Sequence, residues 1–197
     1  MKDRIDEREK WNKIYSSQDI DTFGMEYPFG EFDKEFQETV TQLLPNGGKI
    51  IEIGSGGGWQ SLFLAKTGIF DVTLLDFSEQ ALQFSKSLFA KEGLQAKFVH
   101  RDAFIFGEPE YDLVFNAGVL EHYNFAEQLK LIRAMASYSR KFVLVLTPNT
   151  SCYWYWVWRI NLSYKGEWLY GKEIPIVTMA DLFEQSGLLF VGDKFMG

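Results

Sequence analysis

The stretch Lys49-Ile-Ile-Glu-Ile-Gly-Ser-Gly-Gly-Gly58 decides the fold of this chain. An apolar run, Lys49–Ile53, leads into three spaced glycines, and a helical pattern follows at once from Gln60 to Lys66. This order predicts a buried strand, a tight turn and a helix that begins at the turn. In an open α/β sheet a ligand binds at such a turn, because the free N–H groups of the helix attract negatively charged groups.

The spacing of the glycines narrows the class of ligand. Gly54, Gly56 and Gly58 follow Glu52, whereas a dinucleotide fingerprint counted from Gly54 would need a glycine at Trp59. No Gly-Lys-Ser/Thr sequence follows, so the turn is not a P-loop. The Gly-x-Ser-x-Gly elbow of hydrolases is also absent.

Strands and helices alternate after this turn. Besides 49–53, the sequence predicts strands at 71–75, 97–100, 111–116 and 141–146, and helices at 60–66, 78–92 and 125–137. This rhythm predicts an α/β fold, a Rossmann-like doubly wound sheet that is mostly parallel with helices on both faces. Because right-handed crossovers bring all carboxyl strand ends to one edge, the residues that follow each strand should meet there.

The two ends of the chain depart from this rhythm. We expect a single domain over 1–197, with an N-terminal helical cap at 1–45 and an aromatic insert at 150–176. In the cap, Ile5, Trp11, Ile14 and Tyr15 share one helix face that could lie over the mouth of a site, and 31–44 forms a second helix. A loop with Phe23, Tyr27 and Phe29 separates the two helices. The insert holds Tyr153–Trp158, Trp168 and Tyr170. It either covers an acceptor, or packs as a helical hairpin or forms an interface patch.

After the insert, a helix at 178–186 and the beginning of a sixth strand at Leu188–Val191 are expected before the chain stops at Gly197. On this interpretation the last strands of the sheet are missing, and the chain is the front part of a longer protein.

Composition limits the partners. The net charge is −7 and no dense Lys/Arg cluster occurs, so a nucleic-acid partner is not expected. The single cysteine, Cys152, excludes a disulfide framework and a Cys-based zinc site, and we expect no metal. Met1–Lys10 is charged rather than apolar, and no apolar run approaches the ~20 residues of a membrane span, so we expect a cytoplasmic protein without a signal peptide or span.

Five motifs in register give the chain a resemblance to class I S-adenosylmethionine-dependent methyltransferases. Glu52-Ile-Gly-Ser-Gly-Gly-Gly58 resembles the family's first motif, E/D-x-G-x-G-x-G, and Leu74–Ser78 its acidic second strand end. The stretch Arg101–Phe104 is similar to the acid after its third strand, and Tyr111–His122 to its fourth-strand motif. Finally, Leu146–Asn149 resembles the turn after its fifth strand. The similarity runs from about Gly48 to Asn149 in the right order.

The resemblance implies S-adenosylmethionine as cofactor, with S-adenosylhomocysteine as product. It implies that Glu52 and the glycine turn hold the methionyl part, Asp76 the ribose hydroxyls, and Phe77 and Asp102 the adenine. The residues assigned to the cofactor by this resemblance are Glu52, Gly54, Ser55, Gly56, Gly58, Asp76, Phe77, Asp102, Ala103, Phe104, Asn116, Ala117 and Gly118.

The expected reaction is direct displacement of the methyl group onto an acceptor. The protein then supplies alignment, exclusion of water and one base at most, for which His122 is the candidate; a packing role for His122 is the alternative. We expect the acceptor to be a small apolar or aromatic molecule. Two other functional classes stay open: a catalytically weak or inactive methyltransferase-like binding module, and an NAD-linked oxidoreductase, which the glycine spacing disfavours.

Overall fold

A computed structural model describes residues 2–17 and 29–196, and of residues 2–6 the backbone alone. Five strands form one parallel sheet in the order β3-β2-β1-β4-β5. The strands are β1 (Gly48–Ile53), β2 (Phe70–Asp76), β3 (Lys97–His100), β4 (Tyr111–Ala117) and β5 (Ser139–Leu146). The predicted strands from 49 to 146 are therefore confirmed, with shifts of one or two residues at their ends.

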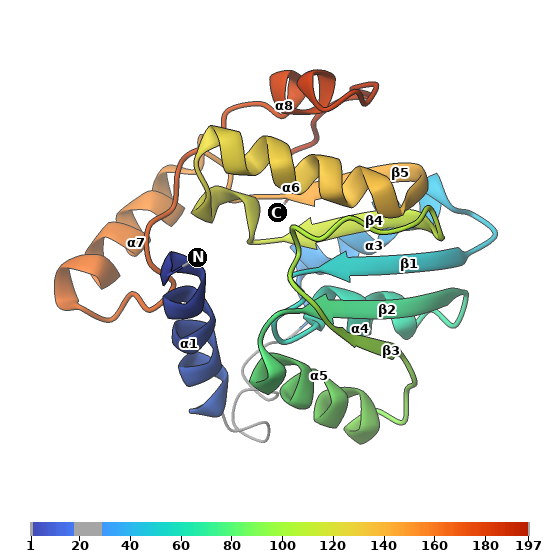
Figure 1. Cartoon of the computed structure of the whole chain (residues 1–197), viewed down its shortest axis with the longest axis horizontal. Helices are drawn as coiled ribbons and strands as arrows, with labels where there is room; N and C mark the ends of the chain where they lie inside the picture. The colour runs from blue at the N-terminus through green and yellow to red at the C-terminus, as the bar shows by residue number, and fades with distance from the viewer. Residues whose placement is uncertain (1, 18–28, 197) are drawn as a thin grey trace.

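Helices cover both faces of the sheet (Figure 1). The helices of the sheet region are α3 (Glu31–Leu43), α4 (Trp59–Ala65), α5 (Glu79–Lys91) and α6 (Phe125–Tyr138), and a short helix, η1 (Leu120–His122), follows β4. Outside this region lie α1 (Lys2–Ser16), α7 (Tyr153–Lys165) and α8 (Ala180–Gln185). None of the helices in the described ranges combines the length and apolarity that crossing a bilayer requires.

Side chains along each strand point alternately to the two faces of the sheet, which divides the core into two clusters. In β1, Ile50 packs with α3, α4 and α5, whereas Ile51 and Ile53 pack with α6 and α8 on the opposite face. The same division separates Leu74 from Leu75 in β2. Since successive side chains of a strand point to opposite faces, a strand of nearly continuous apolar residues is what a sheet with two covered faces needs.

The order of the strands creates a switch point between β1 and β4. The chain first winds from β1 to β2 and β3, and then crosses to β4 on the other side of β1. The loops that leave β1 and β4 thus diverge, and the space between them is where ligands bind in open α/β sheets. Both α1 and α7 lie at the end of the molecule toward which the strands point (Figure 1).

The expected sixth strand is wrong for the described structure, because residues 188–191 form neither helix nor strand. Leu188 and Phe190 do pack against the core near α6 and α8, while Leu189 and Val191 are 88% and 85% exposed. The exposure of the side chains therefore alternates along this segment as it would in a strand with one covered face. What the segment lacks is a neighbouring strand to receive its backbone hydrogen bonds, and without one a strand does not form.

Candidate functional site

A cavity of about 1030 Å³ opens at the carboxyl edge of the sheet. Its wall includes the glycine turn, the end of β2, the loop after β4 and the turn after β5, together with parts of α1 and of the segment around Tyr170. The residues that the sequence predicted to meet there do share this one cavity. Those on the wall are Glu52, Gly54, Ser55, Gly56, Gly58, Asp76, Phe77, Ala117, Gly118 and His122.

Four predicted cofactor residues do not lie on the cavity wall. Asp102 accepts a hydrogen bond from the N–H of Phe104 at 2.9 Å and so closes its own turn, beside Ala103. Phe104 is buried against Tyr123, with ring centroids 5.0 Å apart. Asn116 is fully buried in β4 and donates to the sulfur of Met135. The adenine role of Asp102 and the sulfonium role of Asn116 stay predictions.

The glycine turn is built by close contacts that only glycine allows. Gly54 has φ +69°, and a Cβ there would lie 2.9 Å from a methyl group of Val119. Gly56 has φ +50°, and a Cβ there would lie 2.3 Å from the Tyr15 hydroxyl. Residues with side chains rarely adopt such φ values, so both positions require glycine for conformation and for space. The turn thereby brings β1 against the β4 loop and α1 against the turn itself.

Asp76 ties the turn to the end of β2. Its two carboxylate oxygens accept the N–H of Gly56 at 2.8 Å and the N–H of Ser78 at 2.7 Å. Burial raises its pKa to about 6, and the hydrogen bonds from the backbone oppose that shift. Asp76 is therefore mostly ionised at neutral pH, and each oxygen keeps a further lone pair for a ligand.

Glu52 lies deeper, below the turn. It is 1% exposed and accepts a hydrogen bond from the Ser61 hydroxyl at 2.5 Å. Burial, with the negative charge of Asp76, raises the pKa of Glu52 to about 8 despite the contacts with Ser61. Glu52 is thus mostly protonated at neutral pH, and its hydrogen bond fixes the first turn of α4 against β1.

The donor set fits S-adenosylmethionine, the cofactor that the resemblance implies. The ionised Asp76 suits a ribose diol, and the buried hydroxyl of Ser55 has no hydrogen-bond partner among the described residues. The negative charge of the ionised Asp76 on this wall would also favour a cationic ligand. Residues of this set would hold the methionyl and ribose parts of the cofactor.

Helix α1 covers this part of the cavity, as its apolar face predicts. Tyr15 packs on Phe84 of α5, with ring centroids 6.0 Å apart, and its hydroxyl meets the glycine turn. Asn12 accepts a hydrogen bond from the Ser78 hydroxyl at 2.7 Å. Burial raises the pKa of Tyr15, so its phenol stays protonated. The loop residues Phe23 and Tyr27 lie outside the described residues, and Phe29 packs edge-on against Phe63.

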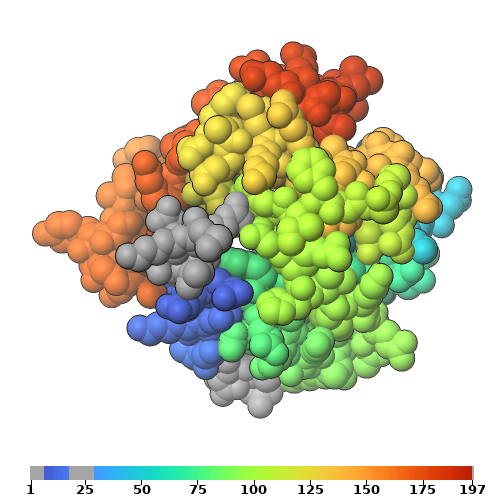
Figure 2. Space-filling view, in the orientation of Figure 1, coloured from blue at the N-terminus to red at the C-terminus, as the bar shows by residue number. Residues whose placement is uncertain are grey.

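The aromatic insert contributes to the cavity with some of its rings and not with others. Tyr155 and Tyr170 lie on the wall, whereas Trp154 and Trp158 do not and are 75% and 51% exposed. Helix α7 protrudes at one side of the molecule (Figure 2), in keeping with this exposure. The hairpin alternative also differs from the structure. The insert contains one helix, α7, and the chain returns from it as a non-helical segment where a hairpin would have its second helix.

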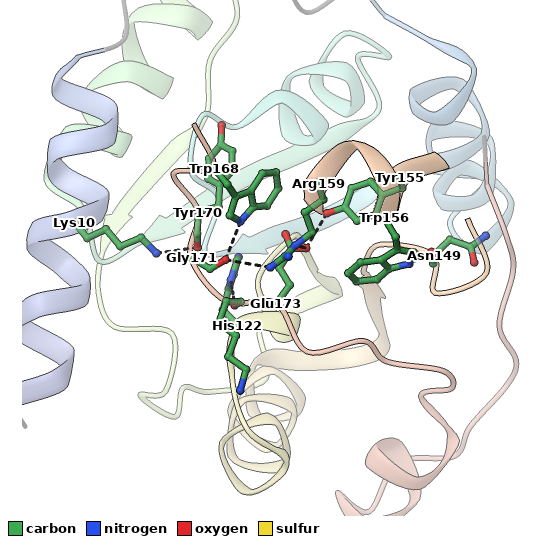
Figure 3. Close-up of polar contacts among 11 residues, drawn as sticks. Lys10, His122, Asn149, Tyr155, Trp156, Arg159, Trp168, Tyr170, Gly171 and Glu173 are labelled. Carbon is green, nitrogen blue, oxygen red and sulfur yellow. Dashed lines mark hydrogen bonds and ion pairs between the residues drawn. The ribbon is translucent and has the colours of Figure 1, made fainter. Parts of the chain in front are cut away.

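His122 lies on the wall beside α1. Its Nδ1 is 3.1 Å from the carbonyl oxygen of Lys172 (Figure 3), and its ring meets Trp11 edge-on at 5.8 Å between centroids. Burial lowers its pKa, although the carbonyl oxygens of Lys172 and Gly118 favour the charged form. His122 is therefore neutral at neutral pH.

Two carboxylates that the sequence analysis missed lie beside His122. One ligating atom each from Glu121, His122 and Glu173 fall within 4.8 Å of one another. Glu121 is adjacent to His122 in the fourth-strand motif, which is the one sequence signal that could have identified it. Glu173 lies within the insert, 15 residues after Trp158, and nothing in the local sequence marks it.

Comparisons with known proteins identify the class of domain. A family model described as "Methyltransferase domain" matches residues 50–141. Human EEF1A lysine methyltransferase 2 is 32% identical over 94 residues, which are 44% of this chain and 39% of that protein.

Solved structures show the same fold. Magnesium protoporphyrin IX methyltransferase from Synechocystis PCC 6803 with bound SAM is 26% identical, with a TM-score of 0.50 and 57% of each chain covered. The structure of that enzyme with bound SAH matches at 20% identity and a TM-score of 0.62, over 79% of this chain and 72% of the other. The chain spans less than two thirds of the human relative and of the first of these structures. The domain matched over residues 50–141, these relatives and the parallel sheet with its glycine turn support a class I S-adenosylmethionine-dependent methyltransferase domain in this chain.

Proposed function

We propose that this chain transfers a methyl group from S-adenosylmethionine to an acceptor bound in the same cavity. The observation that carries the proposal is the ionised Asp76 on the cavity wall, tied by hydrogen bonds to the glycine turn at the switch point of the sheet. The cofactor, when bound, supplies an activated methyl group. The residues of the chain then hold the two reactants in line and exclude water.

The acceptor we propose is a small molecule with an apolar or aromatic body. Support comes from the rings of Trp11, Tyr155 and Tyr170, which line the part of the cavity beyond the glycine turn. For an acceptor that must lose a proton before transfer, the neutral His122 on the same wall is our candidate base. A protein acceptor is the alternative, because the human relative is a lysine methyltransferase.

Calorimetric titration with S-adenosylmethionine, S-adenosylhomocysteine and NAD tests the cofactor. We expect both sulfur compounds to bind and NAD not to bind, because the glycine spacing does not match a dinucleotide site. Binding of NAD alone, or of none of the three, would contradict the proposal. If the two sulfur compounds bind but no methylated product forms with an extract of small metabolites and proteins, the binding-module alternative gains support.

The contribution of the insert to acceptor binding is tested by comparing Tyr155→Ala with Trp154→Ala. The first removes a ring from the cavity wall and should weaken acceptor binding about tenfold or more, as truncation of a buried aromatic contact does. The second removes a ring that is 75% exposed and should change acceptor binding little. Cofactor affinity, measured in parallel, should stay unchanged in both.

A further inference from the structure

The carboxylates of Glu121 and Glu173 face one part of the cavity, next to His122. They reach it from different elements, since Glu121 belongs to η1 and Glu173 to the segment that returns from α7. A backbone hydrogen bond of 2.7 Å from Ile174 to the Glu121 carbonyl joins these elements. The two acids are therefore held together by the fold and do not meet by chance at a flexible surface.

Glu121 is buried without a partner for one of its oxygens. The residue is 3% exposed, and its Oε2 has no hydrogen-bond partner among the described residues. Burial, and after it the negative charge of Glu173, raise the pKa of Glu121 to about 8. A buried carboxyl oxygen without a partner costs free energy, which a ligand that donates a hydrogen bond would recover.

Glu173 is already provided with donors. Its Oε2 accepts hydrogen bonds from Arg159 at 2.7 Å and from the Tyr155 hydroxyl at 2.9 Å, as Figure 3 shows. The side chains of Glu173 and Arg159 are only 5% and 15% exposed, so this ion pair is shielded from solvent. The guanidinium also lies over the ring of Trp168, 5.2 Å from its centroid.

The charges of Glu121, Glu173 and Arg159 do not cancel when both acids are ionised. Two carboxylates, from Glu121 and Glu173, face one guanidinium, from Arg159, which leaves one negative charge. Lys10 lies nearby, but its ammonium donates to the carbonyl oxygen of Tyr170 at 2.8 Å, lies 5.2 Å from the centroid of the Trp11 ring and interacts with the charge of Glu7. One positive charge on a ligand would balance the group, whereas a divalent ion would exceed the balance beside a guanidinium.

Aromatic rings complete the surroundings of this group. Trp11 lies 5.8 Å from His122 and 5.9 Å from Tyr170, measured between ring centroids. Faces of tryptophan and tyrosine attract cations as well as apolar groups. A ligand that combines an aromatic or alkyl body with one cationic nitrogen meets all of these features.

We propose that the methyl acceptor is an amine, bound as an ammonium by Glu121 and Glu173 against the rings of Trp11 and Tyr170. This inference rests on the proposed methyltransferase function and names the chemical class of its acceptor. Glu121 supplies the charge and the unpartnered oxygen, and Glu173, held by Arg159, supplies the second carboxylate.

The chemistry of transfer to such an acceptor balances within the site. A bound ammonium favours the ionised form of Glu121, whose own proton leaves to solvent on binding. The ammonium then gives a proton to this carboxylate, and the nitrogen regains its lone pair. That lone pair forms the new nitrogen–carbon bond while the methyl–sulfur bond breaks, and the electrons of the broken bond stay on sulfur. The product is a methylated ammonium, and Glu121 returns its proton to solvent. For an amine, Glu121 is a better base than His122, because its raised pKa is nearer to that of the amine.

The test compares three probes of one shape on the unaltered protein saturated with S-adenosylhomocysteine: phenethylamine, 2-phenylethanol and 3-phenylpropanoate. Binding is measured by calorimetry at pH 7.5, so no turnover is needed. We expect phenethylamine to bind at least about tenfold more tightly than the alcohol, since a charge-assisted hydrogen bond contributes roughly 1.5–3 kcal/mol. The acid should bind most weakly.

Glu121→Gln keeps the shape of the side chain and removes the charge, and should abolish the preference for the amine. Glu184→Gln makes the same change on an exposed residue outside the cavity and should leave the preference intact. Thermal unfolding of both variants checks their folding, while the probe series on the unaltered protein stands without them. Equal binding of amine and alcohol, preference for the acid, or an amine preference that survives Glu121→Gln would overturn the proposal.

A divalent-cation site is the competing outcome. Titration with MnCl2 that shows tight binding, lost in Glu121→Gln, together with displacement of phenethylamine by Mn²⁺, would overturn the amine site in favour of a metal. Failure of the proposed function is distinguishable from both, because S-adenosylhomocysteine itself would then not bind.

Discussion

The carboxylate of Asp76 accepts hydrogen bonds from two backbone N–H groups and still faces the cavity with free lone pairs. It thus has two roles at once: it holds the glycine turn in place and offers an acceptor to the ligand. The buried Glu52 beneath it has a more limited part, because the hydrogen bonds that its side chain accepts come from Ser61. At the scale of single residues the two acids can therefore be separated by experiment.

Asp76→Asn should weaken binding of S-adenosylhomocysteine by about 10- to 100-fold, since one charge-assisted hydrogen bond contributes roughly 1.5–3 kcal/mol. The amide cannot accept from both backbone N–H groups, so the free energy of unfolding should also fall by about 1 kcal/mol. Calorimetry and urea unfolding measure the two effects. Asp181→Asn, on the exposed side of α8, is the matched control, and equal affinities in the two variants would exclude Asp76 from the cofactor site.

The raised pKa of buried Glu52 predicts that the stability of the protein depends on pH. Its pKa is raised from 4.5 to about 8 in the folded protein, so the folded state binds the proton more tightly than the unfolded state does. Its contribution is thus fully present below pH 4.5 and is lost as the pH rises toward 8, with a slope of at most about 1.4 kcal/mol per pH unit.

Glu52→Gln removes this titration. Its free energy of unfolding, measured relative to the unaltered protein in urea at pH 5, 7 and 9, should therefore improve steadily as the pH rises. Asp76, whose pKa is raised to about 6, titrates in both proteins and cancels in the difference. A difference that stays constant across this range would show that Glu52 is ionised when buried.

At the scale of elements, α1 joins parts of the molecule that are distant in sequence. Tyr15 contacts the glycine turn, Asn12 binds Ser78 at the start of α5, and Trp11 contacts Tyr170 after α7. The helix has little apolar surface apart from this face, as its sequence of alternating charges shows. Its position therefore depends on a few side chains and on what occupies the cavity below it.

Tyr15→Ala should loosen α1 and weaken binding of S-adenosylhomocysteine by roughly tenfold, because a buried aromatic contact at the binding site is lost. Hydrogen exchange should show faster exchange of α1 amides in the variant, and slower exchange in the unaltered protein when the cofactor product is bound. Lys13→Ala, an exposed change on the same helix, is the control. Unchanged exchange of α1 on ligand binding would show that the helix does not close the site.

At the scale of the whole molecule, two apolar cores on opposite faces of the sheet keep the carboxyl strand ends in register. Phe115 in β4, an interior strand of the sheet, is fully buried and packs on Phe36 of α3, with ring centroids 5.4 Å apart. Since Ala117 and Gly118 directly follow on the cavity wall, packing of this strand also sets the position of the site.

Phe115→Ala should lower the free energy of unfolding by about 3–5 kcal/mol, as removal of a buried aromatic ring leaves a cavity. Phe106→Ala removes a ring that is 56% exposed and should cost less than about 1 kcal/mol. Saturating S-adenosylhomocysteine should raise the melting temperature of both variants, because a ligand that binds only the folded state stabilises it. A similar loss in the two variants would contradict the assignment of the core.

Local sequence patterns were enough to predict the sheet and its ligand-binding turn. Five strands, the helices between them and the glycine turn follow from local patterns: apolar runs, helical spacing and glycines that need positive φ. The meeting of Gly54, Asp76 and Gly118 at one edge also follows, because parallel topology forces it. Local patterns were insufficient where a hydrogen-bond partner from elsewhere was needed, as the unpaired segment 188–191 shows.

The residues that line the acceptor side of the cavity could be identified only from the tertiary structure. Glu121 and Glu173 lie 52 positions apart in the chain, and their carboxylates meet because the return from α7 hydrogen-bonds to η1. That Tyr155 lies on the wall while Trp154 and Trp158 do not likewise depends on how α7 is turned. Such contacts join elements across long loops, so their geometry is set by packing of the whole chain and not by any pattern along it.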